Sequence, residues 1–177
     1  MAVEYDELAG LSDPEIVRRW LGEDHPAVDV AIERRTERYR ELVADGSSVT
    51  EDVRAAVQYA AARVPVAVVS GAARTEIEPV LRAAGLTGLV RVIVAAEDVA
   101  RGKPDAAGYL RALELIDGGL AASDVLVFED TEAGVASAKA AGMQCIAVLG
   151  TLPPERLAAA DEVVPSLDVT LMRRLLG

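Results

Sequence analysis

The sequence predicts an α/β protein with a doubly wound parallel sheet, and three observations support this class. Short apolar runs typical of buried strands alternate with helical patterns from Val64 to the end of the chain. Hydrophobic residues make up 51% of the 177 residues, which is enough for a sizeable core. Alanine, valine and leucine are abundant whereas aromatic residues are only 3%, a composition that suits helices packed closely on a sheet. Right-handed crossovers between the strands are expected.

The segment before Asp45 has helical patterns throughout and no convincing strand. A short helix is expected over residues 13–21, where an Asp-Pro pair gives a cap and a first-turn proline, and a longer one over about 26–44. The turn residues Asp-Gly-Ser-Ser that begin at Asp45 mark a change of composition. We therefore predict a small helical domain, a partial cap, over residues 1–46 and an α/β core over 47–177.

In the core, the alternating patterns give the following elements. Strands are expected at 64–70, 89–95, 125–129, 144–149 and 163–164, and helices at 50–63, 75–84, 109–116, 131–141, from 153 onward and at 169–176. Thr75 and Glu78 have the spacing of a capping box. The carboxyl ends of parallel strands share one edge of a sheet, so side chains that follow different strands can meet there.

Two adjacent carboxylates, Glu129 and Asp130, directly follow the apolar run that begins at Val125. Ligands of open α/β sheets bind at this kind of edge, and neighbouring carboxylates repel each other unless a cation compensates. A magnesium site is the economical interpretation. The alternatives are a solvated pair in a loop or a negative charge at a helix N-terminus.

Two further groups could join these carboxylates, because Ser70 ends one expected strand and Lys103 lies in the loop after another. A hydroxyl, an ammonium group and a metal-holding carboxylate pair together suit phosphoryl transfer. Taken singly, Ser70 can be an ordinary turn residue and Lys103 a solvated loop lysine. Arg34, with the arginines around it on the second helix, either pairs with nearby glutamates on a solvated face or reaches toward an anionic substrate.

The formal net charge of -11 argues against nucleic acid or an anionic membrane surface as a partner. The N-terminus has no signal-peptide pattern and no apolar run is long enough to span a membrane, so a cytoplasmic location is expected. Cys145 is the only cysteine and lies in an apolar run, which makes it a small core residue. The sequence does not separate a monomer from a weak dimer.

The stretches Val-Ala-Val-Val-Ser-Gly-Ala-Ala-Arg74, Arg-Gly-Lys-Pro104 and Val-Phe-Glu-Asp-Thr-Glu-Ala-Gly134 resemble three motifs of the haloacid dehalogenase superfamily. They are the second, third and fourth motifs, and they look closest to the beta-phosphoglucomutase-like phosphatase branch. The resemblance covers essentially the whole chain, because the residues before Asp45 are similar to the later part of that branch's helical cap.

This resemblance implies a magnesium-dependent enzyme that acts on small phosphomonoesters such as sugar phosphates. Ser70 and Gly71 would bind the phosphoryl group, and Lys103 would neutralise the charge of the transferring and attacking groups. Asp130 would hold Mg²⁺, with Glu129 beside it as a further ligand or as its support. Arg34 matches a cap arginine that contacts substrate phosphate.

The chain departs from the family at the first motif, a strand that ends in Asp-x-Asp-Gly and supplies the nucleophile and the general acid/base. No two aspartates are separated by one residue, so by resemblance roughly the first ~30 residues of a family member are absent. The absent strand would be central, between the strands that end at Ser70 and Asp130. We expect either two open strand edges or direct pairing of those strands, with weaker magnesium binding and no chemistry.

Two interpretations follow. The favoured one is a phosphatase or phosphomutase of this superfamily whose 177 residues are truncated and inactive on their own. The alternative is a non-catalytic binding or regulatory module that keeps the fold. A nucleotide-binding enzyme fits poorly because the chain has no Gly-x-Gly-x-x-Gly or Walker-type loop.

Overall fold

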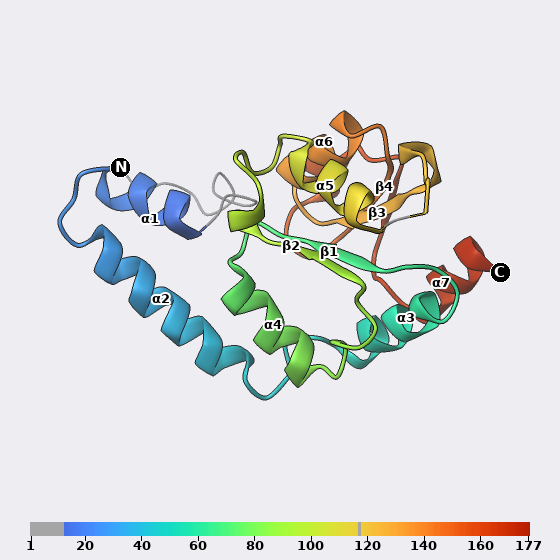
Figure 1. Ribbon diagram of the computed structural model, residues 1–177, viewed down its shortest axis with the longest axis horizontal. Coiled ribbons are helices and arrows are strands. Elements are labelled where there is room, and N and C mark those ends of the chain that lie inside the picture. The colour runs from blue at the N-terminus through green and yellow to red at the C-terminus, as the bar shows by residue number, and fades with distance from the viewer. Residues whose placement is uncertain (1–12, 117) are drawn as a thin grey trace.

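The computed structural model describes residues 13–116 and 118–177, in which strands and helices alternate along the chain (Figure 1). The strands are β1 (Ala67–Val69), β2 (Val92–Val94), β3 (Leu126–Glu129), β4 (Gln144–Val148) and β5 (Glu162–Val164). The α-helices are α1 (Asp13–Leu21), α2 (Val28–Val43), α3 (Glu51–Ala61), α4 (Arg74–Ala83), α5 (Ala107–Ile116), α6 (Glu132–Ala140) and α7 (Val169–Leu176). Single turns of 3₁₀ helix lie at Ala96–Asp98, Ala122–Asp124 and Pro154–Leu157.

The strands form two parallel sheets rather than one. β1 pairs with β2, and β3, β4 and β5 form a second sheet in that order. The predicted parallel, doubly wound arrangement is confirmed, but among the described residues no backbone ladder joins β1 to β3. Of the two outcomes expected for a sheet without its central strand, the described residues show edges of β1 and β3 without a strand partner and not the direct pairing.

Helices cover both faces of the two sheets (Figure 1). On one face α5 packs on β1 and β2, and α6 packs on β3 and β4 and also contacts α5. On the other face lie α3, α4 and α7, with α3 packed against α7. The carboxyl ends of β1 and β3 are therefore held within one layered body although the strands themselves do not pair.

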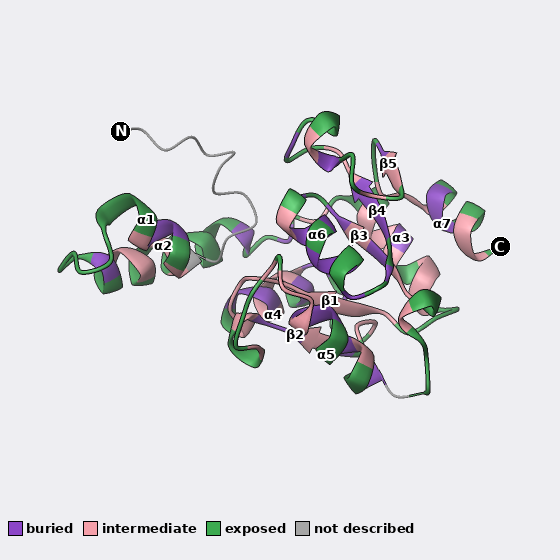
Figure 2. Ribbon diagram, turned by 90° about the horizontal axis from the view of Figure 1, so that it is seen from above, coloured by how far each residue is buried: buried purple, intermediate pink, exposed green. Residues whose placement is uncertain are grey.

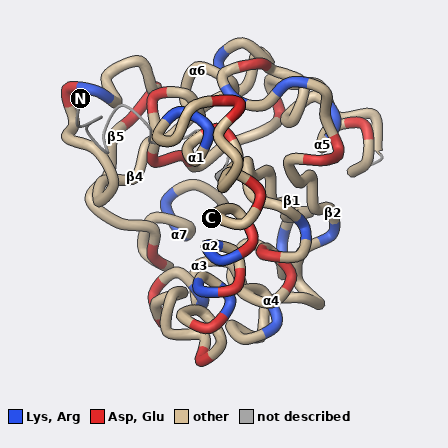
Figure 3. The backbone as a smooth tube through the Cα atoms, turned by 90° about the vertical axis from the view of Figure 1, so that its left-hand side faces the viewer, with Lys and Arg blue, Asp and Glu red and all other residues tan. Residues whose placement is uncertain are grey.

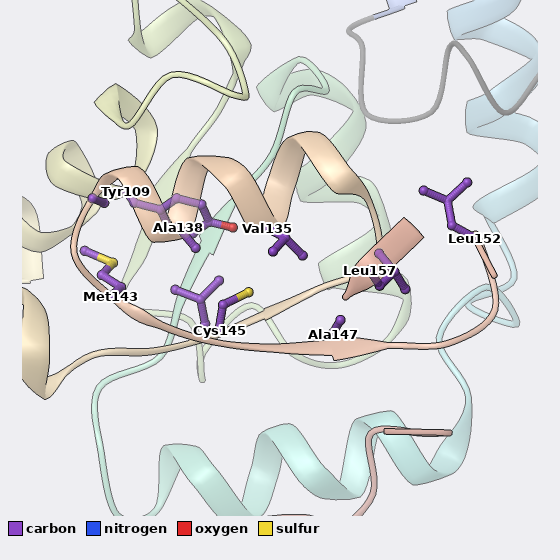
Figure 4. Packing of buried hydrophobic residues seen from close by; sticks show 10 residues of the cluster. Tyr109, Val135, Ala138, Met143, Cys145, Ala147, Leu152 and Leu157 are labelled. Carbon is purple, nitrogen blue, oxygen red and sulfur yellow. The ribbon is translucent and has the colours of Figure 1, made fainter. Parts of the chain in front are cut away.

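The main hydrophobic cluster lies between α6 and the second sheet (Figure 4). Val135 and Ala138 of α6 pack against Cys145 and Ala147 of β4, and all four are almost completely buried. The predicted core position of Cys145 is confirmed. Small side chains on both sides let α6 approach the strands closely, which fixes where its N-terminus lies relative to the end of β3.

Local capping accounts for the helix starts that position the site. Thr50 and Thr131 are the N-caps of α3 and α6, and their side chains accept hydrogen bonds from Val53 N at 3.3 Å and Gly134 N at 3.1 Å. The predicted capping box at Thr75 is wrong. The α4 helix begins at Arg74, one residue earlier, and the Glu76 side chain accepts a hydrogen bond from the Ala73 backbone instead.

The helices α1 and α2 extend to one side of the α/β layers (Figure 2), and α2 packs against α4. This arrangement is compatible with the predicted boundary near Asp45, which stays a prediction. Acidic and basic residues alternate along the helices instead of forming separate blocks (Figure 3). Within residues 13–116 and 118–177, none of the helices has both the length and the apolar character that crossing a membrane requires.

Candidate functional site

The centre of the site is an ion pair between Lys103 and Glu129, which joins the loop after β2 to the end of β3. The Lys103 ammonium group contacts Oε1 of Glu129 and also donates to the carbonyl oxygen of Val69, the last residue of β1, at 3.2 Å. Both charged side chains are largely buried, with exposed fractions of 15% for Lys103 and 5% for Glu129. One ammonium group therefore connects the carboxyl ends of the two sheets.

Tyr109 on α5 is the second partner of this carboxylate. Its hydroxyl donates to Oε1 of Glu129, and the Lys103 ammonium lies 5.5 Å from the centre of its ring. Burial raises the pKa of Tyr109 strongly, and the negative charge of Glu129 raises it further. The hydroxyl therefore stays protonated and remains a hydrogen-bond donor to Glu129.

Gly134, in the first turn of α6, allows the Glu129 carboxylate to occupy its position. A Cβ atom at residue 134 would lie 1.9 Å from Oε2 of Glu129, so a larger residue cannot be accommodated without movement. The carboxylate thus sits directly against the N-terminal turn of a helix, where the backbone dipole favours a negative charge. The glycine of the motif read from the sequence is required by this close approach.

Asp130 differs from its neighbour Glu129 because its side chain is exposed. The hydroxyl of Thr151, in the loop after β4, donates to Oδ2 of Asp130 at 2.5 Å. This hydrogen bond holds the carboxylate over the carboxyl edge of the second sheet. Of the two adjacent acids, Asp130 is the one that a ligand from solvent can reach.

Ser70 follows β1 at the same edge, and its backbone N–H donates to Val94 O at 3.0 Å. Its hydroxyl oxygen accepts a hydrogen bond from Ala72 N at 3.1 Å, which leaves the hydroxyl proton available for a ligand. Gly71 lies between these two residues in the turn that leads to α4. The structure therefore places Ser70 and Gly71 directly after the Val69 carbonyl that Lys103 contacts.

Arg34 is not brought into this cluster by any described hydrogen bond or ion pair. It lies exposed on α2, where the neighbouring Arg38 pairs with Glu41 at 2.8 Å. That pair agrees with a solvated face of arginines and glutamates on this helix. The assignment of Arg34 to substrate binding stays a prediction.

Magnesium suits the chemistry of Asp130 better than that of Glu129. Among the described residues there is no group of three or more acidic, histidine or cysteine side chains that could hold a metal ion. The negative charge of Glu129 is already compensated by Lys103 and by a hydrogen bond from Tyr109, and this side chain is buried. Asp130 is exposed and offers carboxylate oxygens, the type of ligand that Mg²⁺ prefers. A Mg²⁺ ion usually needs one or two carboxylates and completes its shell with water and substrate oxygens.

Sequence reasoning missed two residues of the site. Tyr109 is expected only as part of the helix over residues 109–116, and Thr151 is not singled out. The available signal for Thr151 was its position just after an apolar strand, at the same sheet edge as Asp130. The hydroxyl of Tyr109 had no signal in the sequence, because its partner Glu129 lies 20 residues away.

A match to a model of a known protein family identifies the group of proteins to which the chain is related. The model of the haloacid dehalogenase-like hydrolases matches residues 4–142, which include Ser70, Lys103, Glu129 and Asp130. The chain belongs to this hydrolase family. The resemblance read from three motifs is thereby confirmed, and so is the fold class.

Named relatives of this haloacid dehalogenase-like chain include phosphatases. The validoxylamine A 7'-phosphate phosphatase of Streptomyces hygroscopicus subsp. limoneus is 39% identical over 105 residues, which cover 59% of this chain and 48% of the relative. Protein CbbY of Rhodobacter capsulatus is 32% identical over 142 residues, covering 76% of this chain and 61% of the relative.

Among solved structures, a mutant of CbbY from Rhodobacter sphaeroides in complex with xylulose-(1,5)bisphosphate superposes with a TM-score of 0.79 at 29% identity. The match covers 93% of this chain and 77% of the CbbY chain. In contrast, the chain spans 48% or less of the first three curated relatives that it matches. These matches show the family and the fold of the chain. The activity of the whole protein is the subject of the proposal that follows.

Proposed function

We propose that the chain belongs to a magnesium-dependent phosphoryl-transfer enzyme, a phosphatase or phosphomutase, that acts on small phosphomonoesters such as sugar phosphates. The observation that carries this proposal is the position of Lys103, whose ammonium group is held by Val69 O and Glu129 at the carboxyl ends of both sheets. A fixed positive charge at this edge suits an anionic phosphoryl group. The phosphatase names of relatives support the same substrate class.

In this proposal Ser70 donates its free hydroxyl proton to a phosphoryl oxygen, with Gly71 beside it giving the ligand room to approach. Lys103 neutralises negative charge that develops during transfer. Asp130 holds Mg²⁺, with Glu129 next to it, and the bound ion supplies further positive charge against phosphoryl oxygens. Arg34, on the partial helical cap over residues 1–46, contacts substrate phosphate, and the other groups belong to the α/β core over residues 47–177.

The 177 residues are expected to be inactive by themselves. Neither Ser70 nor Thr131 has a described basic partner that could activate it as a nucleophile. The sequence also has no two aspartates separated by one residue, the arrangement that the family's first motif supplies. A cytoplasmic location, a monomer or weak dimer, and the absence of nucleic-acid and membrane partners complete this proposal as predictions.

The test compares magnesium-dependent hydrolysis of para-nitrophenyl phosphate by the 177-residue chain and by a version extended at its N-terminus through the native upstream codons. We expect activity only in the longer form, and loss of at least about 10²-fold in it when Asp130→Asn removes the exposed carboxylate. Asp52→Asn, an equally exposed acid at the start of α3, is the matched control and should keep full activity. An active short chain would contradict our account of the nucleophile.

A second candidate, a non-catalytic binding or regulatory module, is favoured by one observation. Glu129 is already engaged by Lys103 and Tyr109, so the site is electrostatically satisfied without a metal. This candidate predicts that the 177-residue chain melts cooperatively and binds inorganic phosphate, while both forms lack hydrolytic activity. Release of phosphate by the extended form would reject it, and transfer to a sugar would separate a mutase from a phosphatase.

A further inference from the structure

The loop that follows β4 brings the hydroxyl of Thr151 to the exposed carboxylate of Asp130. This hydroxyl donates to Oδ2 of Asp130 at 2.5 Å, although the two residues lie 21 positions apart in the sequence. Within residues 13–116 and 118–177, no ion pair and no further side-chain hydrogen bond reaches this carboxylate. One oxygen of Asp130 is therefore engaged by the protein, and Oδ1 is the oxygen left for a ligand from solvent.

The loop over residues 149–157 is anchored on both sides of Thr151. Before it, the backbone N–H of Leu149 donates to the last residue of β5 at 2.9 Å. After it, the side chains of Leu152 and Leu157 are buried in the main hydrophobic cluster between α6 and the second sheet (Figure 4). These contacts restrict the backbone around Thr151, so its hydroxyl is held close to the end of β3.

A further contact ties the same loop to the helix that follows Asp130. Nε of Arg156 donates to Oε2 of Glu132, in the first turn of α6, at 2.7 Å. The loop and the segment that carries Asp130 are thus joined at two points, by Thr151 and by Arg156. Because neither segment can move alone, the Thr151 hydroxyl and the Asp130 carboxylate keep a fixed relative position.

The way in which a carboxylate is held affects the kind of ion that it binds. Mg²⁺ demands near-ideal octahedral geometry, keeps several waters and takes one or two carboxylates. Ca²⁺ is larger, accepts about six to eight oxygens in flexible geometry and can take both oxygens of one carboxylate. A carboxylate with one oxygen held by a protein hydroxyl therefore suits Mg²⁺ better than Ca²⁺.

We propose that Thr151 is a positioning residue for Asp130, which holds Oδ2 by its hydrogen bond so that Oδ1 alone binds the metal ion. This inference rests on the proposed magnesium site at Asp130, and it adds a residue on which the affinity and the ion preference of that site depend. Hydrogen bonds to metal-binding carboxylates fix their orientation, and removing such a partner typically weakens metal binding by about 10- to 100-fold.

The test measures metal binding without substrate, in the N-terminally extended form of the protein. The probe is Mn²⁺, whose free ion gives an EPR signal, and Mg²⁺ and Ca²⁺ are added as competitors. Thr151→Val removes the hydroxyl but keeps the shape of the side chain, and we expect it to weaken Mg²⁺ binding by at least about tenfold. Ca²⁺ binding should weaken by less than about threefold, because a carboxylate that is free to turn can offer both oxygens to the larger ion.

Three further variants make the test specific, each checked by circular dichroism for a folded chain. Thr151→Ser keeps the hydroxyl and should bind both ions within about threefold of wild type. Thr87→Val is the matched control, because Thr87 is exposed in the loop between α4 and β2 and has no described side-chain hydrogen bond. Asp130→Asn should abolish binding at this site, and adding Thr151→Val to it should cause no further loss, since the hydroxyl acts only through this carboxylate.

Three results would overturn this inference and leave the proposed function standing. One is an unchanged Mg²⁺ affinity in Thr151→Val. Another is an equal loss in Thr151→Ser and Thr151→Val, which would assign the effect to the shape of the loop and not to the hydroxyl. The last is an equal loss for Mg²⁺ and Ca²⁺, which would mean that Asp130 does not bind through a single oxygen. In contrast, wild-type affinity in Asp130→Asn would overturn the proposed magnesium site itself, and this inference with it.

Discussion

The largely buried ammonium group of Lys103 and the buried carboxylate of Glu129 form the ion pair that holds the loop after β2 against the end of β3. The pair is made between residues 26 positions apart, on opposite sides of the interruption between the two sheets. Because Val69 O accepts a hydrogen bond from Lys103 and the Tyr109 hydroxyl donates one to Glu129, this cluster joins four separate segments of the chain.

Replacement of Lys103 by methionine should lower the free energy of unfolding by about 3–5 kcal/mol, because it leaves the Glu129 carboxylate buried without a compensating charge. The matched control is Arg101→Met in the same loop. Arg101 pairs with Asp105 at 2.9 Å but is 78% exposed, so its loss should cost no more than about 1 kcal/mol. Urea unfolding of the two variants measures their free energies of unfolding. Equal losses of stability would show that the Lys103–Glu129 pair contributes no more than an exposed ion pair.

Replacement of Gly134 by alanine should destabilise the protein even though alanine favours helices. The gain in helix propensity is at most about 1 kcal/mol. The new Cβ atom would lie 1.9 Å from Oε2 of Glu129, and forcing that carboxylate to move costs about 1–3 kcal/mol. Gly88→Ala is the control, because a Cβ there meets nothing within 4 Å. Thermal unfolding that is unchanged in Gly134→Ala would mean that Glu129 can relax freely.

Alkaline pH should weaken the fold through Tyr109. Burial and the charge of Glu129 raise the pKa of Tyr109 in the folded state, so the folded state holds this proton more tightly than the unfolded chain. The contribution of Tyr109 to the free energy of unfolding is fully present below about pH 10, which is the pKa of a tyrosine in the unfolded chain. This contribution is lost progressively as the pH rises above that value.

Chemical unfolding between pH 8 and pH 11, as an experimental range, checks this direction. Wild type should lose stability above about pH 10. The Tyr109→Phe variant should start lower, since it lacks the hydrogen bond to Glu129, but should lose less with rising pH. Parallel pH profiles of the two proteins would contradict the role of the tyrosine proton.

Cys145 should be unreactive toward thiol reagents in the folded protein. Its side chain is completely buried, and burial together with the charge of Glu129 raises the pKa of this thiol to about 11. With a global stability typical of small domains, labelling by 5,5'-dithiobis(2-nitrobenzoate) at pH 8 should be slower than in the unfolded chain by at least roughly 10³-fold. Unfolded protein in urea gives the reference rate, and fast labelling without denaturant would show that β4 opens locally.

Much of the local structure could be predicted from short-range patterns. The starts of α3 and α6 were predicted close to Thr50 and Thr131, because the signals that begin a helix lie within a few residues of its first turn. The motif that ends at Gly134 also placed the two carboxylates correctly at the end of a strand. The start of α4 was predicted one residue too late, because Glu76 and not Glu78 is the glutamate whose side chain accepts a hydrogen bond from the backbone at the start of the helix.

The roles of the site residues depended on contacts over longer distances. Sequence order suggested that Ser70, Lys103 and Glu129 meet, but it treated Glu129 as a metal neighbour and did not reveal its partner Tyr109. Whether a carboxylate pairs with a lysine or stays exposed depends on burial, and burial is set by helices that pack from elsewhere in the chain. The difference between Glu129 and Asp130 therefore appears only in the folded structure.

Local sequence patterns were enough to predict the alternation of strands and helices, the family motifs and the grouping of charged residues at one sheet edge, because periodicity and capping act among residues close in the chain. The division of the strands into two sheets, and the contact of Lys103 with both of them, became visible only in the folded chain. Strand pairing is a long-range choice, since each edge joins whichever partner the helix layers bring within hydrogen-bonding distance, and among the described residues β1 and β3 are not brought that close.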